Sequence, residues 1–381
     1  MFIRVDFNVP VRDGEIGDST RIDNALSTVR FAIKAGARVI LASHLGRPGG
    51  KVVTEMSLAP VARALAEKLE QPVTLLADCV GQSTRDYVAA MNDGDITLLE
   101  NLRFHAEETD NDPAFAGELG ALCDVYINDA FGTAHRAHAS TEGITHHVAE
   151  CAAGFLMKRE IEALGALLAK PEAPFVAIVG GAKVSDKIAL LANLLPRTDA
   201  VLVGGAMAYT FLRAKGVAVG TSRVEEDRIE MAAEVLADAA RRGVTIELPV
   251  DHVVASGFAE DARPQITDGV EIPEGTMGLD IGPKTRALYA QRIQEARTIL
   301  WNGPMGVFEW AAFSTGTMTV AEAVADSEGR AVVGGGDSVA ALGASGRGKD
   351  IWHISTGGGA SLEFLEGRKL PGIAALESRT D

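Results

Sequence analysis

Four hydrophobic segments in the second half of the chain run directly into paired or tripled glycines. They are FVAIV-GG (175–181), AVLV-GG (200–205), RAVV-GGG (330–336) and WHIST-GGG (352–359). Glycine has no Cβ, so the chain can turn sharply there and bare N–H groups can approach a ligand. Since ligands of open parallel sheets bind at the carboxyl ends of the strands, the pattern predicts one sheet whose strand ends share an anionic ligand.

The length and the order of the elements predict two α/β domains. The chain has 381 residues, which is long for a single core. Strand and helix patterns alternate in both halves, as in βαβ units with mostly parallel sheets. We expect two doubly wound, Rossmann-like domains at 1–154 and 155–365, a hinge helix at about 147–170 that ends before Pro171, and a tail at 366–381. One large α/β domain is the alternative.

Composition narrows the possible partners and the location of the protein. The net charge is −16, which argues against nucleic acid or an anionic membrane as the main partner. The three cysteines form no C-x-x-C motif, so neither a disulfide framework nor a zinc motif is indicated. No uncharged apolar run approaches the roughly 18 residues that span a bilayer. We expect a cytoplasmic protein with reduced thiols.

Basic residues follow the predicted strands of the first domain. Residues 1–154 hold only 13 Lys+Arg against 22 Asp+Glu. Arginine grips carboxylate or phosphate through two parallel hydrogen bonds, so converging arginines predict an anion pocket. The first strand, expected at 2–9, finishes with Asp6 and Asn8, whose i, i+2 spacing puts them on one face, where they could accept from a substrate hydroxyl. The predicted pocket comprises Asp6, Asn8, Arg21, His44, Arg47, Arg103 and Arg136.

Two alternatives remain open for this first domain. The first is that each arginine, taken alone, simply forms an ordinary ion pair at the surface. His135 and His138, spaced i, i+3, could bind a metal ion if their segment were helical, although no third ligand is apparent.

Two glycine turns of the second domain carry charged residues suited to a nucleotide. Gly180 to Lys187 joins a strand to a helix, and Lys183 and Lys187 would share one face if that turn were helical. In the second turn, Gly334 to Ser338, the amides suit a phosphate and Asp337 could bind Mg²⁺. The alternative is that Asp337 and Ser338 simply cap the following helix. Residues 343–349 match part of a Walker A motif, but the stretch precedes a strand and is read as a surface loop.

An anion pocket in one domain and a nucleotide site in the other suit phosphoryl transfer between two bound substrates. Closure about a hinge helix would bring the substrates together and exclude water. A two-domain anion-binding protein without catalysis is a second hypothesis. It leaves Lys183, Lys187 and Asp337 unexplained. A dinucleotide dehydrogenase is a third, and no G-x-G-x-x-G with a matching downstream acid supports it.

Eight segments carry a more specific resemblance. In chain order, they are RVDFNVP (4–10), SHLGRP (43–48), LLENLRFHAEE (98–108), INDAFGTAHRAHAST (127–141), VGGAKVSDK (179–187), WNGPMGVFE (301–309), GGGDS (334–338) and STGGGASLEFLEG (355–367). Together they resemble the phosphoglycerate kinase family over nearly the whole chain.

The resemblance implies reversible, Mg²⁺-dependent transfer between 1,3-bisphosphoglycerate and ADP, giving 3-phosphoglycerate and ATP in glycolysis. It also implies a monomer that binds only small molecules. The seven residues of the predicted anion pocket match the family's phosphoglycerate site. Arg21 and Lys183 match the groups that stabilise the phosphoryl in flight, and no general base is needed. The nucleotide site matches Lys187, Gly278, Asn302, Glu309, Gly335, Gly336, Asp337 and Ser338, with Asp337 nearest the metal.

Three features depart from the family pattern. Family members usually carry a short lead-in before the first strand, and here Met1 almost begins that strand. Residues 204–206 read Gly-Gly-Ala where three glycines are common, which would slightly crowd the nucleoside pocket. Serine replaces the usual threonine at position 338 and keeps the hydroxyl.

Overall fold

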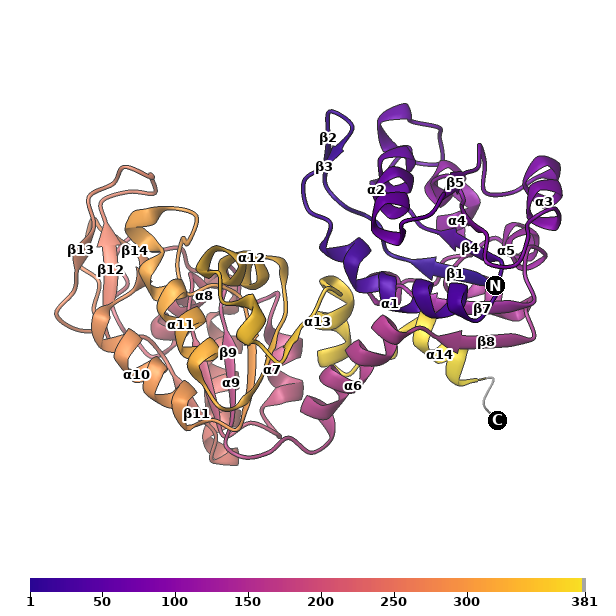
Figure 1. Cartoon of the computed structure of the whole chain (residues 1–381). Helices are drawn as coiled ribbons and strands as arrows, with labels where there is room; N and C mark the ends of the chain where they lie inside the picture. Colours follow the sequence, from indigo (N-terminus) through magenta and orange to yellow (C-terminus); the bar gives the residue numbers. More distant parts are fainter. Residues whose placement is uncertain (379–381) are drawn as a thin grey trace. The chain divides into compact units, whose positions relative to one another are not determined.

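The structure, a computed structural model, describes residues 1–378 and divides into two compact units (Figure 1). Unit 1 comprises Met1–Glu162 together with the C-terminal segment that begins at Lys369, and unit 2 comprises Ala163–Arg368. The boundary between them falls inside helix α6 (Phe155–Ala169). None of the helices within the described residues is long and apolar enough to cross a membrane.

Unit 1 is built on a parallel six-stranded sheet of order β5-β6-β4-β1-β7-β8. A short antiparallel hairpin, β2 (Val11–Arg12) with β3 (Glu15–Ile16), follows β1. The sheet strands are β1 (Phe2–Val5), β4 (Val39–Ala42), β5 (Thr74–Leu75), β6 (Ile96–Leu98), β7 (Val125–Asp129) and β8 (Glu150–Ala153). The helices are α1 (Thr20–Lys34), α2 (Ala59–Leu69), α3 (Gln82–Ala89), α4 (Ala106–Asp110), α5 (Pro113–Gly120) and α14 (Pro371–Glu377).

Apolar side chains fill both faces of this sheet, as expected for a parallel sheet covered by helices. Ile3 and Val5 of β1 pack in one cluster with the apolar faces of α1 and α2. Phe2, which points to the opposite side, packs with residues of α5. Since side chains alternate along a strand, Arg4 lies on the same face as Phe2, and it is fully buried there.

Unit 2 contains a second parallel six-stranded sheet, of order β11-β10-β9-β15-β16-β17. Its strands are β9 (Phe175–Val179), β10 (Ala200–Val203), β11 (Thr245–Glu247), β15 (Thr298–Asn302), β16 (Arg330–Val333) and β17 (His353–Ile354). A separate antiparallel sheet contains β12 (His252–Ala255), β13 (Gln265–Ile266) and β14 (Met277–Ile281).

Helices of unit 2 complete its hydrophobic core. Those that contribute to the main core cluster are α10 (Pro283–Glu295), α11 (Thr315–Asp326) and α12 (Gly336–Ser345), which pack against β9, β15 and β16. The remaining helices are α7 (Ile188–Leu194), α8 (Met207–Ala214), α9 (Ile229–Arg242) and α13 (Gly359–Leu365). Two largely parallel α/β sheets were predicted from the sequence, and this prediction is confirmed.

The predicted start of the long helix near residue 147 is wrong. Residues 150–153 form β8, which pairs in parallel with β7, and α6 begins only at Phe155. The buried Asp129 carboxylate at the end of β7 accepts from the N–H groups of Leu156 and Met157, at 2.9 and 3.1 Å. This carboxylate lies at the positive N-terminal end of α6. The residue that caps the start of α6 therefore lies on β7 and not in the segment that precedes the helix.

Candidate active site

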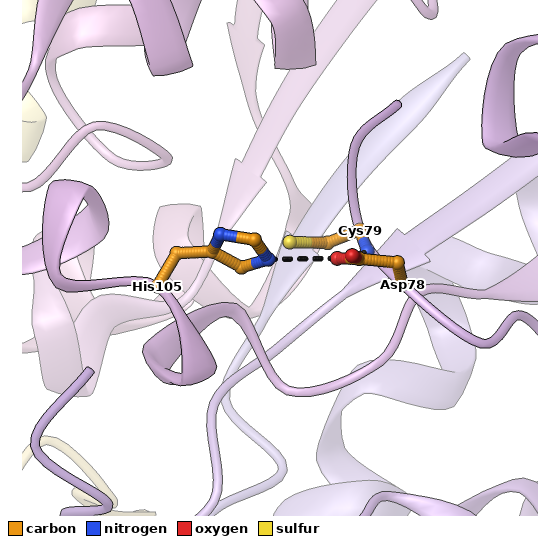
Figure 2. A group of neighbouring side chains, drawn as sticks. All are labelled: Asp78, Cys79 and His105. Carbon is orange, nitrogen blue, oxygen red and sulfur yellow. Dashed lines mark hydrogen bonds and ion pairs between the residues drawn. The ribbon is translucent and has the colours of Figure 1, made fainter. Parts of the chain in front are cut away.

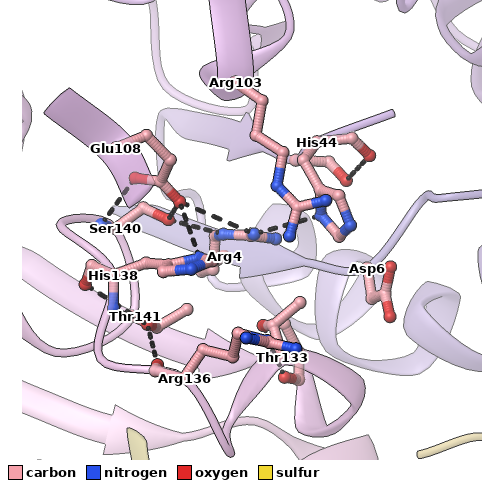
Figure 3. Close-up of polar contacts among 12 residues, drawn as sticks. Arg4, Asp6, His44, Arg103, Glu108, Thr133, Arg136, His138, Ser140 and Thr141 are labelled. Carbon is pink, nitrogen blue, oxygen red and sulfur yellow. Dashed lines mark hydrogen bonds and ion pairs between the residues drawn. The ribbon is translucent and has the colours of Figure 1, made fainter. Parts of the chain in front are cut away.

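Residues predicted to bind an anion follow the carboxyl ends of strands in the unit 1 sheet, and Figure 3 shows Asp6, His44, Arg103 and Arg136. Asp6 and Asn8 follow β1, and His44 follows β4. Arg103 lies in a 3₁₀ turn, η2 (Leu102–Phe104), after β6, and Arg136 follows the turn η3 (Phe131–Thr133) after β7. Parallel strands end at one edge, so these positions converge. We call the set Asp6, Asn8, Arg21, His44, Arg47, Arg103 and Arg136 the anion pocket.

Three arginines of the anion pocket have no carboxylate partner within residues 1–378: Arg47, Arg103 and Arg136. Arg103 donates to the carbonyl oxygen of Gly46 at 2.9 Å, and its buried Nε has no hydrogen-bond partner among the described residues. Burial, and then the charge of Arg4, lower the pKa of the Arg103 guanidinium. These three guanidinium groups therefore lack a directly paired carboxylate among the described residues, which favours an anionic ligand.

Arg21 and Asp6 form an ion pair in the anion pocket, with 2.8 Å between Nη1 and Oδ2. Arg21 lies in the first turn of α1, and about a third of its side chain is exposed. The side-chain oxygen of Asn8 accepts from the Gly46 N–H at 2.9 Å. Because this acceptor is engaged within the protein, Asn8 has its amide N–H group to offer to a ligand.

A buried polar network beneath the anion pocket was not predicted from the sequence (Figure 3). Arg4 donates to the Ser140 hydroxyl at 2.7 Å and lies 3.9 Å from Glu108, and both charged side chains are fully buried. Ser140 in turn donates to Glu108 at 2.6 Å. The available signal was an arginine inside a buried strand, since a buried charge requires a partner. Its charged partner, Glu108, lies far along the chain, beyond Arg103, so no local pattern connects the two.

Arg4 also fixes the hydrogen-bonding state of His44. The guanidinium Nη2 lies 3.3 Å from Nδ1 of the ring. Arginine can only donate, so Nδ1 accepts and the proton resides on Nε2. Burial, followed by the charges of Arg4, Arg103 and Arg21, holds the pKa of His44 well below its usual value. His44 is therefore a neutral hydrogen-bond donor in the anion pocket.

His138, in the same network, makes unit 1 sensitive to acid. Burial lowers its pKa from 6.5 to about 4. Between these pH values the unfolded chain binds a proton that the folded chain excludes, so stability falls as the pH falls. The slope from this one group reaches at most about 1.4 kcal/mol per pH unit. His138→Gln is expected to remove this slope in urea unfolding followed from pH 7 to pH 4.

The matched control for this prediction is His146→Gln. His146 is 63% exposed and pairs with Glu142 on the surface of the same unit. This control should keep the pH dependence of the unmodified chain. An unchanged slope in His138→Gln would show that His138 is not the group responsible.

Neither His135 nor His138 lies in a helix, so the helical metal pair considered above does not form.

In unit 2, the first glycine turn leads into α7 through a loop. Lys187 is the N-cap residue of α7, so residues 181–187 are not helical and the condition under which the two lysines would share a helix face is not met. The Glu225 carboxylate accepts from the N–H groups of Val184 and Ser185 and from the Ser185 hydroxyl. Two amides of the turn are thus occupied by a side chain distant in sequence. Lys183 remains exposed.

Lys187, at the start of α7, contacts Asn302, the last residue of β15. The Lys187 ammonium donates to the Asn302 side-chain oxygen, and the Asn302 amide donates to Gly334 O at 3.0 Å. Burial lowers the pKa of Lys187, while the nearby charges of Asp186 and Asp337 oppose that shift. The structure therefore brings Lys187, Asn302 and the Gly334 turn together.

The second glycine turn begins α12 without a side-chain cap. Gly335 is the N-cap residue. Its φ of +91° is a backbone conformation that residues with a side chain rarely adopt. Ser338 is fully buried and accepts from the Gly303 N–H, and Asp337 is exposed with no hydrogen bond or ion pair among the described residues. The capping alternative for Asp337 and Ser338 is therefore wrong. The Asp337 carboxylate, in the first turn of α12, is available to a ligand.

A cavity of about 360 Å³ lies beside these turns, within the size range of small-molecule sites. Its walls include the predicted residues Gly278, Glu309 and Asp337, with Ala206 from the Gly-Gly-Ala turn. The sequence did not single out the aromatic and basic walls, Tyr209, Phe258 and Arg223. Tyr209 lies in α8, just after the Gly-Gly-Ala turn, whereas Arg223 and Phe258 come from other segments that no predicted motif marked. Apolar walls next to a free carboxylate suit a nucleoside with its phosphates.

Comparisons with known proteins match this chain to a single family over nearly its whole length. The family model described as phosphoglycerate kinase matches residues 1–368. The phosphoglycerate kinase of Koribacter versatilis is 54% identical over 388 residues, and that of Moorella thermoacetica is 55% identical over 379 residues. Each alignment covers 100% of this chain and 96% of the relative.

Solved structures agree in fold. The structure of phosphoglycerate kinase from Coxiella burnetii matches with a TM-score of 0.92 and 44% identity. Phosphoglycerate kinase from Pyrococcus horikoshii OT3 matches with a TM-score of 0.85 and 36% identity. Both comparisons cover 100% of this chain and 96% of the solved chain. The chain belongs to the phosphoglycerate kinase family.

Proposed function

We propose that this chain catalyses the Mg²⁺-dependent, reversible transfer of the acyl phosphate of 1,3-bisphosphoglycerate to ADP, giving 3-phosphoglycerate and ATP. As a member of its family it is a glycolytic phosphotransferase with a carboxyl group as acceptor, and it acts on small molecules. One observation carries the residue-level proposal. Arg47, Arg103 and Arg136 have no carboxylate partner within residues 1–378, although the net charge of the chain is −16.

In this proposal, the anion pocket binds the phosphoglycerate. Arginine forks suit its phosphate and carboxylate groups. Neutral His44 donates from Nε2, and Asn8 donates from its amide. The ion pair between Arg21 and Asp6 holds the Arg21 guanidinium at the pocket edge. The arrangement binds an anion without placing a titrating base beside it.

Unit 2 is proposed to bind the nucleotide. The cavity lined by Gly278 and Glu309 would receive the nucleoside. Lys187 and Asn302 would contact the phosphates at the turn formed by Gly335, Gly336 and Ser338. The positive end of α12 favours phosphate at this position.

The residues around Asp337 fit a magnesium ion. Mg²⁺ prefers one or two carboxylates together with phosphate oxygens, and Asp337 offers an exposed carboxylate without an internal partner among the described residues. We therefore propose Asp337 as the protein ligand. When bound, the ion would neutralise charge on the nucleotide phosphates.

Asp337→Asn is expected to raise the Mg²⁺ concentration needed for half-maximal activity by at least about 10- to 100-fold, because removing a direct ligand costs no less than removing a residue that only orients one. The measurement is a Mg²⁺ titration of ATP formation at fixed ADP. Asp350→Asn, which alters an exposed aspartate paired with Arg347, is the control and should leave the titration unchanged. Identical titrations for both variants would remove Asp337 from the metal site.

The phosphoryl transfer is proposed to need no general base. The attacking group is already an anion, either the carboxylate of 3-phosphoglycerate or a phosphate of ADP. Catalysis then depends on in-line positioning and on cations matched to the charge of the transferred group. We assign that role to Arg21 and Lys183. The hinge closure expected from the sequence would bring the substrates together and exclude water.

We further propose a phosphoglycerate domain at 1–154 and a nucleotide domain at 155–365, with α6 within the expected hinge helix. The expected boundary lies at the start of α6. In the expected tail, 366–381, the Gly372 N–H donates to Ala134 O at 2.9 Å, and residues 379–381 lie outside the described residues. A cytoplasmic monomer without nucleic-acid or membrane partners completes the proposal.

The test of this function is ATP formation from ADP and 1,3-bisphosphoglycerate with Mg²⁺. A non-catalytic anion-binding protein would form no ATP above the uncatalysed rate. A dehydrogenase would instead change nicotinamide absorbance without any coupling enzyme. Enzyme-dependent ATP formation supports the proposal, and its absence with folded protein would contradict it.

A further inference from the structure

Figure 2 shows a cysteine, a histidine and an aspartate that lie close together in unit 1. The metal-ligating atoms of Asp78, Cys79 and His105 all lie within 4.8 Å of one another. Among the described residues, this is the one group of three or more such side chains arranged to hold an ion. Neither the anion pocket nor the glycine turns of unit 2 include any of them. We propose that these three residues form a zinc-binding site.

The three ligand types are those that Zn²⁺ prefers. Zn²⁺ binds thiolate, imidazole and carboxylate at about 2.0–2.3 Å, which places neighbouring ligand atoms about 3–4 Å apart. The three ligand atoms lie within 4.8 Å of one another, and the Asp78 Oδ1 to His105 Nε2 distance is 2.7 Å, so the hydrogen bond between these two side chains must open to admit the ion. Three protein ligands leave a fourth position of a tetrahedral ion for water. Cys79 is buried, whereas the side chains of Asp78 and His105 are 48% and 29% exposed, so an ion can enter from the solvent side.

Local contacts hold the three groups in place. Asp78 Oδ1 lies 2.7 Å from His105 Nε2 and accepts from the Cys79 N–H at 2.6 Å. The His105 ring lies 5.2 Å from the Phe115 ring, measured between centroids. The Thr84 hydroxyl donates to the carbonyl oxygens of Asp78 and Val80, which ties the loop to the start of α3. The site therefore loses little freedom on binding.

The charge balance also favours a divalent cation. Binding would release the Cys79 proton to solvent and would require His105 Nε2 without the proton that it shares with Asp78. The ion would then compensate one thiolate and one carboxylate. Neutral His105 supplies the third ligand without adding charge.

The sequence did not indicate this site because its ligands are far apart. His105 follows Asp78 by 27 positions, and no paired cysteines mark the segment. The competing explanation is an ordinary surface pair, Asp78 with His105, above a core cysteine. That explanation predicts no metal affinity that depends on Cys79.

The test is Zn²⁺ binding to the full chain after treatment with a chelator, measured by competition with a chromogenic chelator. We expect one Zn²⁺ per unmodified chain and loss of that ion in Asp78→Asn, Cys79→Ser and His105→Gln. The matched controls should keep it: Cys151→Ser changes a cysteine that contacts backbone carbonyls, and His146→Gln breaks a histidine–carboxylate pair of 2.6 Å that is not part of this group.

Co²⁺ provides a direct reading of the sulfur ligand. The unmodified chain loaded with Co²⁺ should show thiolate-to-metal charge-transfer absorbance, which Cys79→Ser should lose and Cys151→Ser should retain. Zn²⁺ should also raise the Tm of the unmodified chain and not that of His105→Gln, a partly exposed position suited to a folded variant. Equal Zn²⁺ affinity in the unmodified chain and His105→Gln, or no charge-transfer band, would overturn the proposal.

Discussion

Replacing Arg21 with alanine is expected to lower kcat by about 10²- to 10³-fold, as for the loss of one donor that stabilises transition-state charge. The reason is that no general base assists the transfer, so positive charge aimed at the phosphoryl group carries much of the rate. The measurement is kcat at saturating substrate for both the variant and the unmodified chain. Thermal unfolding of the variant checks that unit 1 stays folded.

The structure offers a control for Arg21 on the same helix. Arg30 is exposed on α1 and donates to the Lys68 carbonyl oxygen, outside the anion pocket. Arg30→Ala should leave kcat unchanged. In Arg21→Ala, the Asp6 carboxylate still accepts from the Asn8 N–H, which limits the structural loss. Near-normal turnover in Arg21→Ala would remove Arg21 from its proposed role.

Lys183→Ala is expected to lower kcat by a similar factor, about 10²- to 10³-fold, with little change in stability. Lys183 is exposed and makes no hydrogen bond or ion pair among the described residues, so its removal takes away only its charge near Glu225. Exposed substitutions of this kind usually change the free energy of unfolding by less than about 0.5 kcal/mol. Turnover and unfolding in urea should therefore separate clearly.

Lys349→Ala is the matched control in unit 2. Lys349 is exposed and ends the stretch that resembles part of a Walker A motif. The structure places residues 343–345 in the last turn of α12 and residues 348–350 in a 3₁₀ turn, so the expectation of a loop over the whole stretch is wrong. The stretch still follows a helix and not a strand, so the variant should keep full activity. A large loss of activity in Lys349→Ala, combined with normal turnover in Lys183→Ala, would contradict the account. It would indicate that the phosphate site lies at residues 343–349 and not at the first glycine turn.

The regular parts of the fold could be predicted because their signals are local. Apolar strands that end in glycine carry their own pattern, and the structure has β9, β10 and β16 at the predicted segments. The start of α6 could not be predicted, because its capping carboxylate, Asp129, lies 27 residues before Leu156. Without that contact in view, β8 and α6 read as one helix.

The same distinction applies to the candidate site. Charged residues just after strands were visible in the sequence, and the arginines of the anion pocket lie at one sheet edge. The support beneath them was not visible, since Arg4 reaches Ser140 across 136 positions. Glu225, whose carboxylate binds amides of the first glycine turn, follows Ser185 by 40 positions. Tertiary contacts of this kind have no local sequence pattern.

The division of the two substrates between the two units is the central claim, and calorimetric titration of Arg136→Ala tests it most directly. Arg136 has no ion-pair partner within residues 1–378. Loss of one charge-assisted contact, about 1.5–3 kcal/mol, should weaken 3-phosphoglycerate binding by about 10- to 100-fold. Arg85→Ala, which breaks an exposed ion pair with Glu118, is the control. We predict that the affinity for Mg·ADP stays unchanged in both variants. Normal 3-phosphoglycerate affinity with weakened Mg·ADP binding in Arg136→Ala would contradict the account.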